Sequence, residues 1–440
     1  MTAADIRKRL AETIENLSKV AWLFLRNPSK DFTRKRKLSF QDTVSFLLAM
    51  EGKSTTNELL DYFRCSVNAP TSSALRQQRD KILPEAFEFL FWEFVDACAD
   101  KHALYNGYRL LAVDGSDLSI ATNPSDPDSY FPGCNGQKPY NILHLNALYD
   151  LRQKVYVDAV IQKRKSVNEF KALCQMVDRS NIPNALLLAD RGYESYNALA
   201  HIQEKKWKFL FRVKDGKHGI ISGLALPDAE EFDCPIHLSL TRKQSNEVKE
   251  LRKQNPCLRY IAHSSPFDFL PAHTRKYDPF VSYTLHFRVV RFKLTDTSYE
   301  TVLTNLDPVA FPPQKLKDLY AMRWGIETSF RDLKYTVGLA SFHSKKVEHI
   351  FQEIFARLIM YNFSELVTAS VVIQKKNRKY AYQANFSAAV HICRQFFRGN
   401  VHPPNLEALL ARFISPVRPD RKQARKLTRR GVVSFVYRVA

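Results

Sequence analysis

Two short and largely apolar runs, each followed directly by an aspartate, constrain most strongly how this chain can fold. Tyr108–Val113 ends at Asp114, and Ala185–Ala189 ends at Asp190. Such a run, without polar alternation, is typical of a strand buried on both faces in the middle of an α/β sheet. Because side chains at the carboxyl ends of these strands meet over one edge of the sheet, the two aspartates are expected to lie close together.

The segments around these runs indicate a mixed α/β sheet that is covered by helices on both faces. We expect strands at 142–151, 155–162 and 208–213 and helices at 167–179 and 196–205. Taken alone, each aspartate also fits an ordinary turn, because Asp-Gly-Ser and Asp-Arg-Gly are common turn sequences. Their assignment to a catalytic site therefore depends on a third block further along the chain.

The charge balance of the chain indicates a polyanionic partner. The 440 residues include 66 Lys and Arg against 45 Asp and Glu, a formal net charge of +21. Hydrophobic residues make up 45% of the chain, which excludes a largely disordered protein. A folded chain this basic works beside nucleic acid or an anionic membrane. No uninterrupted apolar run approaches the roughly 18 residues of a membrane span, so nucleic acid is favoured and no membrane is expected.

Cysteine usage and the N-terminal segment indicate where the protein works. Seven cysteines stand at least 23 positions apart, a spacing that excludes CxxC zinc knuckles and gives no disulfide framework. Residues 1–17 are charged and amphipathic and contain no apolar leader. We therefore expect a cytoplasmic protein with reduced thiols, associated with the nucleoid when it is bound to DNA.

Residues 1–104 are expected to form a helical DNA-binding domain. The expected short helices, joined by tight turns, are 40–50, 55–63 and 72–82. Three such helices suit a module of the helix-turn-helix kind. The third carries Arg76, Gln77 and Arg79, which are candidates for DNA recognition because such side chains reach phosphates and base edges. The alternative is a plain helical cap with a solvated polar face.

The remaining chain divides into four regions by its local patterns. They are the first part of a catalytic core at 105–214, a β-rich insertion at 215–305, the end of the core at 306–375 and a helical and basic C-terminal region at 376–440. The basic tail, Arg418–Arg430, either follows DNA phosphates without sequence preference or forms a solvated helix.

A block near residue 330 supplies a third carboxylate. Four polar side chains stand at offsets 0, 3, 7 and 14: Tyr320, Arg323, Glu327 and Lys334. On one continuous helix, expected at 313–337, these offsets fall within a stripe about 60° wide. A neighbouring apolar stripe would pack on the sheet: Leu319, Met322, Ile326, Phe330 and Leu333. The alternative is an exposed helix with an Arg323–Glu327 ion pair.

Three carboxylates supplied by two strands and a helix suit two divalent metal ions in one active site. Asp114, Asp190 and Glu327 offer oxygen ligands, which favour Mg²⁺ or Mn²⁺ over zinc. Two such ions, about 3.5–4 Å apart, serve phosphodiester hydrolysis by activating the attacking oxygen and stabilising the leaving one. The sequence contains no HExxH pair, no GxxxxGK[ST] loop and no GxGxxG fingerprint.

With these blocks in order, the chain resembles the DDE transposases of the insertion-sequence-four family. That family is marked by a Y-(2)-R-(3)-E-(6)-K signature, which Tyr320, Arg323, Glu327 and Lys334 match without a gap. Asp114 and Asp190 match its first and second acids. The resemblance implies a ribonuclease-H-like core that a β-rich insertion interrupts before the third acid.

The resemblance also implies a reaction and its partners. Two-metal chemistry would nick the element end, form a hairpin, reopen it and join the end to target DNA. The partners would be double-stranded DNA, as terminal inverted repeats and as target, and a second copy of the chain in the DNA complex. Tyr320, Arg323 and Lys334 would contact phosphates, and the order of segments assigns base stacking in the hairpin step to Tyr299.

Two other functions remain open on the sequence. One is a nuclease of the ribonuclease-H fold that cuts DNA without joining it. The other is a catalytically inactive DNA-binding protein descended from a transposase. Loss of one of the three acids would indicate such a protein. All three acids are present, and the signature with the N-terminal helices favours transposition.

Overall fold

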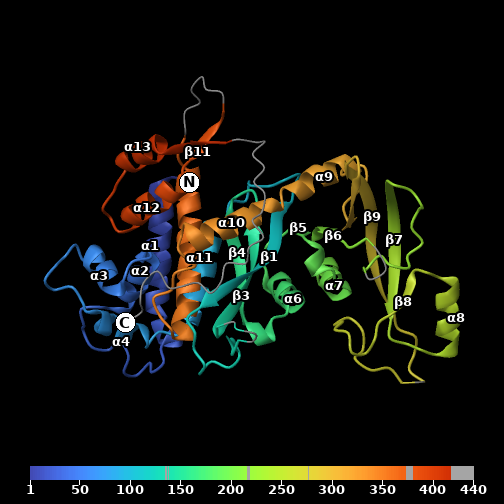
Figure 1. Ribbon diagram of the computed structural model, residues 1–440, viewed down its shortest axis with the longest axis horizontal. Helices are drawn as coiled ribbons and strands as arrows, with labels where there is room; N and C mark the ends of the chain where they lie inside the picture. Colours follow the sequence, from blue (N-terminus) through green and yellow to red (C-terminus); the bar gives the residue numbers. More distant parts are fainter. Residues whose placement is uncertain (134–135, 137, 216–218, 276, 373–379, 418–440) are drawn as a thin grey trace.

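The computed structural model describes residues 1–133, 136, 138–215, 219–275, 277–372 and 380–417. Figure 1 shows a helical part, in which the first and last helices gather around α11, beside a long sheet. The helical part contains α1 (Ala3–Lys19), α2 (Phe40–Ala49), α3 (Thr55–Tyr62), α4 (Ser72–Arg79), α5 (Glu85–Ala97), α11 (Val347–Ala369), α12 (Phe386–Phe397) and α13 (Asn405–Arg412). The short helices expected near residues 40, 55 and 72 are therefore present. Two short strands, β11 (Tyr382–Ala384) and β12 (Ile414–Pro416), pair beside α12 and α13.

One sheet organises the rest of the described chain. Its strands are β1 (Arg109–Ile120), β2 (Tyr130–Phe131), β3 (Tyr140–Asp150), β4 (Val155–Lys163), β5 (Ala185–Ala189), β6 (Lys208–Arg212), β7 (Phe232–Thr241), β8 (Leu258–Tyr260), β9 (Tyr283–Thr295) and β10 (Ser298–Thr304). Their order is β2-β3-β1-β5-β6-β10-β9-β7-β8, and β4 pairs with β3. β1, β5 and β6 are mutually parallel, whereas β3 and β10 run antiparallel to their neighbours.

Helices cover both faces of the central strands. α6 (Glu169–Arg179) and α7 (Tyr196–Glu204) pack on the face that carries Leu111 and Leu187, while α9 (Pro313–Ala321) packs on the face that carries Leu110 and Leu186. α10 (Trp324–Tyr335) follows α9 and contacts β1. Successive strand residues alternate between these faces, so a strand must be apolar throughout to bury both. The expected mixed α/β sheet is confirmed.

One hydrophobic core crosses the boundary expected at residue 104. It joins Phe46 of α2 and Phe91 of α5 to Leu358 of α11 and Phe396 of α12, and it reaches Ile326 of α10. The N-terminal helices therefore pack as one unit with the C-terminal helices. The 215–305 region likewise continues the central sheet, because β10 pairs with β6, and it adds α8 (Asn246–Gln254) at the far end (Figure 1).

Several expected boundaries are wrong. The strand expected to end at Val113 runs on to Ile120 because β3 pairs with it along that whole length. The C-terminal region, which was expected to be helical, also contains the paired strands β11 and β12. The basic tail, Arg418–Arg430, lies outside the described residues. None of the helices in the described part of the chain is long and apolar enough to cross a membrane.

Candidate active site

The first two acids lie at matching positions on neighbouring parallel strands. The β1–β5 register pairs Ala112 with Leu188, so Asp114 and Asp190 each stand two residues beyond that pair. Asp190 follows the end of β5, where its Oδ1 accepts a 2.8 Å hydrogen bond from the Gly192 N–H. Asp114 lies inside β1 instead of beyond its end, since β1 continues in its pairing with β3. The strand register therefore brings both carboxylates to one region of the sheet.

Asp114 is the electrostatic centre of this region. Burial, assisted by the negative charges of Asp190 and Glu327, raises its pKa to about 6, although the Gly115 N–H and Arg323 act in the opposite direction. The repulsion from Asp190 and Glu327 shows that the three acids, from β1, β5 and α10, share one environment. A carboxyl group with such neighbours favours the approach of a positive charge.

The third block forms two helices instead of one. α9 ends at Ala321 and α10 begins at Trp324, and the turn between them is tightened by hydrogen bonds from the Arg323 N–H to Tyr320 O and from the Ile326 N–H to Arg323 O. These i to i+3 bonds wind the joint more tightly than an α-helix. The single stripe expected across residues 320–334 is therefore wrong in its geometry.

Arg323 connects the joint to the third acid. Its side chain is buried, and its Nη2 donates a 2.7 Å hydrogen bond to Glu327 Oε1. The guanidinium also lies 5.8 Å from the ring centroid of Tyr320 and 5.2 Å from that of Trp324. Arg323 thereby supplies the positive charge beside Glu327 in this state of the protein.

The Tyr320 hydroxyl is buried and has no hydrogen-bond partner among the described residues. Burial raises the pKa of this phenol to about 12, so it stays protonated at neutral pH. A buried hydroxyl without a partner costs free energy that a bound acceptor would recover. This geometry suits donation to a ligand oxygen.

Lys334 reaches β1 from the last turn of α10. Its Nζ donates a 2.8 Å hydrogen bond to the Asp117 carbonyl oxygen, three residues beyond Asp114. Burial lowers the pKa of Lys334, while the charges of Asp117 and Asp114 oppose that shift. The cation therefore lies along the same strand as the first acid.

A cluster that sequence reasoning missed adjoins the site. His144 of β3 has Nδ1 at 2.7 Å from Asp117 Oδ1 and Nε2 at 2.9 Å from Glu169 Oε1. Burial alone would lower the pKa of His144, but the hydrogen bond with Asp117 and the close carboxylate of Glu169 outweigh it and raise that pKa to about 9. A Cβ at Gly115 would lie 2.5 Å from His144 Nε2, so a larger residue there would have to displace the side chains of this cluster. The β1–β3 register places Asp117 opposite His144, and no local sequence motif predicts that pairing.

The three acids suit a divalent metal ion by their chemistry more than by their present arrangement. In the part of the chain that the structure describes, no three His, Cys, Asp or Glu side chains are gathered closely enough to hold a metal ion. The chemistry of Asp114, Asp190 and Glu327 nevertheless fits a hard cation, because all three offer carboxylate oxygens and their mutual repulsion raises the pKa of the buried one. Glu327 is instead engaged by Arg323.

The remaining candidate residues lie away from the acids on the chain. Arg76 and Gln77 are exposed on α4. Arg79 is buried, and its guanidinium donates to Gln352, to Glu353 and to a carbonyl of α11. The expected role of Arg79 in DNA recognition is therefore wrong, because its buried guanidinium is already bonded to α11.

Tyr299 lies on β10 opposite Lys293 of β9. Its hydroxyl donates to Glu230, and the Arg291 guanidinium lies 5.2 Å from its ring centroid. The ring is partly exposed, and the Arg291 cation lies over one of its faces.

Comparison with known proteins gives the family. Residues 105–363 match the family described as transposase DDE domain. The chain is 22% identical over 343 residues to the transposase InsG for insertion sequence element IS4 of Escherichia coli strain K12, a match that covers 75% of this chain and 70% of that protein. A cryo-EM structure of a piggyBac transposase synaptic complex with hairpin DNA aligns with a TM-score of 0.41 and 10% identity, over 96% of this chain and 84% of that one.

The matched domain spans more than half of the chain and contains all three acids and the signature residues. The resemblance expected from the sequence is thus confirmed. The protein belongs to the DDE transposases, in the insertion-sequence-four family, which are enzymes that cleave DNA and transfer its strands.

Proposed function

We propose that this transposase binds the terminal inverted repeats of its insertion sequence, cuts the DNA there and joins the freed ends to target DNA. The observation that carries this proposal is the electrostatic coupling of Asp114 with Asp190 and Glu327. Like charges brought together from β1, β5 and α10 destabilise a folded chain unless a cation joins them. Such an arrangement is typical of a catalytic site.

The strand order supports a ribonuclease-H-like core for this reaction. In the series β4-β3-β1-β5-β6, β3 is antiparallel and β5 is parallel to the central β1. On this proposal, 105–214 and 306–375 make the core, 215–305 is the insertion that extends its sheet, 1–104 binds DNA, and 376–440 completes the helical part.

Asp114, Asp190 and Glu327 would hold two Mg²⁺ or Mn²⁺ ions. When bound, such ions activate the attacking oxygen and stabilise the leaving oxygen of a phosphodiester. Glu327 has to exchange its bond with Arg323 to take this role. Arg323 is then free for a DNA phosphate, which its planar guanidinium binds through two parallel hydrogen bonds.

Tyr320 and Lys334 would position the DNA on either side of Glu327. The unpaired Tyr320 hydroxyl supports donation to a phosphate oxygen. Lys334 gives up only a carbonyl contact with Asp117 when it turns to a phosphate. For the hairpin step we propose Tyr299 as the stacking residue, and we propose that two copies of the chain hold the two element ends.

The test is strand cleavage on a labelled duplex that carries the inverted repeat flanking the reading frame. We expect Mg²⁺-dependent nicking that is lost when Asp114, Asp190 or Glu327 is replaced by Ala, while DNA binding persists. Glu247→Ala, which removes an exposed carboxylate from α8, is the matched control and should nick normally.

Each other outcome identifies a different protein. Any acid variant that nicks at the wild-type rate removes that residue from the site. Wild-type protein that nicks but never joins a 3′-end to a target plasmid is a nuclease without joining activity. Wild-type protein that binds the repeat but does neither is an inactive DNA-binding protein.

A further inference from the structure

A cleft separate from the acids lies between the N-terminal helices and the loop that joins α10 to α11. Its volume is about 680 Å³, and residues of three segments line it: 52–56 at the start of α3, 72–80 along α4, and 340–349 after α10. The cleft therefore has one wall from the expected DNA-binding region and one from the chain that follows the catalytic helix.

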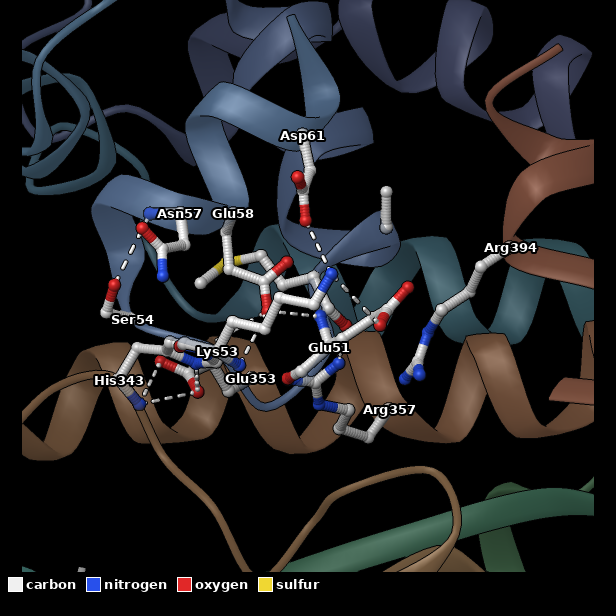
Figure 2. A network of polar contacts seen from close by, with 12 residues as sticks. Glu51, Lys53, Ser54, Asn57, Glu58, Asp61, His343, Glu353, Arg357 and Arg394 are labelled. Carbon is white, nitrogen blue, oxygen red and sulfur yellow. Dashed lines mark hydrogen bonds and ion pairs between the residues drawn. The ribbon is translucent and has the colours of Figure 1, made fainter. Parts of the chain in front are cut away.

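A buried polar network fixes these walls relative to each other (Figure 2). His343, in the loop, has Nε2 at 3.0 Å from the Lys53 carbonyl and Nδ1 at 3.1 Å from Glu353 of α11. Glu58 of α3 accepts 2.9 Å hydrogen bonds from the N–H groups of Glu51 and Lys53. The cleft is consequently preformed, which lowers the entropy cost of binding a ligand in it.

Two cations of the cleft remain available to a ligand. Acidic neighbours pair with Lys53, Arg79 and Lys346. Arg76 of α4 and Lys345 of the loop are exposed, and their side chains make no hydrogen bond or ion pair with any residue in the described ranges. Each wall thus presents one unpaired positive charge.

The starts of two helices add donors to the same cleft. Ser54 caps α3 and Thr71 caps α4, each accepting from the third residue of its helix. The N–H groups of Thr55 and Ser72, the first residues of these helices, have no partner inside their helices. The start of a helix also carries a partial positive charge. The buried His349 also lines the cleft, and its Nε2 lies 2.9 Å from Asp80 without hydrogen-bond geometry.

We propose that this cleft binds the sugar-phosphate backbone of double-stranded DNA, and that Arg76 and Lys345 contact phosphates from its two walls. The proposal rests on the proposed function and extends it, because both the N-terminal helices and the loop after α10 would contribute to the surface that binds the element end. The lining residues Leu75 and Phe342 are buried, and about half of the accessible lining is polar, including the cationic side chains. Phosphate oxygens are the ligands that such a lining accepts.

The composite wall has a consequence for the reaction. The loop of the cleft continues directly from α10, which carries Glu327 and Lys334. DNA seated in the cleft therefore contacts the same stretch of chain that carries the third acid. The N-terminal helices alone present only half of the surface.

The first test measures the salt dependence of duplex binding by the full chain. Each phosphate contact contributes about 0.9 to the slope of log K against log salt. We expect Arg76→Ala and Lys345→Ala each to lower the magnitude of the slope by about 0.9, and the double variant to lower it by about 1.8. Lys249→Ala, an exposed cation on α8 at the far end of the sheet, should leave the slope unchanged.

A second test introduces a negative charge that does not harm the fold. Ser72→Glu places a carboxylate at the first residue of α4, where it stabilises a helix. We expect about tenfold weaker duplex binding at low salt with unchanged thermal stability. The matched control, Asn246→Glu, makes the same change at the first residue of α8 and should bind normally.

The outcomes separate this inference from the proposed function. If wild-type protein binds DNA and all cleft variants keep its slope and affinity, the cleft is not the DNA surface and the inference fails. If loss is confined to Arg76→Ala and Lys345→Ala binds normally, the composite surface fails. If wild-type protein binds no duplex at all, the proposed function itself fails.

Discussion

Single side chains around the acids carry the most specific information about this enzyme. Tyr320 keeps a buried hydroxyl without a partner in the described structure, and Arg323 engages the carboxylate of Glu327. The unpartnered hydroxyl is costly in the free protein, and a ligand that supplies an acceptor would recover this cost. The site is therefore organised for a bound state.

Tyr320→Phe tests whether the hydroxyl of Tyr320 serves a bound ligand. Removing the unpaired hydroxyl should raise the free energy of unfolding by up to about 1 kcal/mol, because the buried polar group no longer lacks a partner. The same change should slow nicking, since a donor to the phosphate is lost. Urea unfolding and a nicking time course measure the two effects. Stability that falls together with activity would contradict the phosphate-donor role.

His144 predicts a pH dependence of stability. Its pKa rises from 6.5 to about 9 in the folded protein, through Asp117 and Glu169 against burial, so its contribution is complete below pH 6.5. That contribution is lost as pH rises through 9, and it amounts to at most about 3 kcal/mol. The difference in unfolding free energy between wild type and His144→Gln should shrink from pH 6.5 to 9.5. A constant difference across that range would mean that His144 is not charged.

At the scale of elements, the joint between α9 and α10 decides where the signature residues lie. The spacing of Tyr320, Arg323, Glu327 and Lys334 was readable from the sequence, and so was the position of Asp114 and Asp190 directly after two apolar runs. The break after Ala321 was not, because it contains neither proline nor a cap and all its residues keep helical backbone angles. Tertiary packing of α9 on the sheet and of α10 on β1 determines it.

Lys334→Ala should separate positioning from chemistry. Glu327 and Lys334 are two turns apart in α10, about 10.5 Å along its axis, so they serve different atoms of the DNA. Nicking should persist but slow by up to about a hundredfold, because a misplacement of the reacting phosphate by about 1 Å can have that effect on the rate. Hairpin formation should slow more than nicking. A gel that resolves nick, hairpin and blunt product gives each rate. Complete loss of nicking, as for Glu327→Ala, would make Lys334 part of the metal site.

At the scale of the whole molecule, the sheet and the helical part form a continuous body. The sequence predicted the central strands and the N-terminal helices, because binary patterns fix local structure. It did not predict that α11 is buried along most of its length between first and last helices, since pairing of distant segments leaves no local pattern. Arg79 illustrates this: its helix was expected correctly, and its partner, Glu353, lies 274 positions away.

A fragment that begins at Tyr105 should therefore fail to fold. Without α1, α2 and α5, apolar residues of α11 such as Ile354 and Leu358 would face water. We expect an aggregating protein without a cooperative thermal transition, measured by calorimetry and size-exclusion chromatography beside the full chain. A soluble fragment with a cooperative transition would show that 1–104 is a separate domain.

The shared core also bears on how such an element diversifies. Mobile elements acquire new DNA preferences readily when the recognition head is a detachable module that recombination can exchange. Here the N-terminal helices and the last helices interlock around α11, so a foreign N-terminal region would have to match a buried surface that the C-terminal half supplies. On the proposed function, new end preferences would have to arise by substitution on the existing scaffold, and the transposase and the ends it binds would have to change together, step by step.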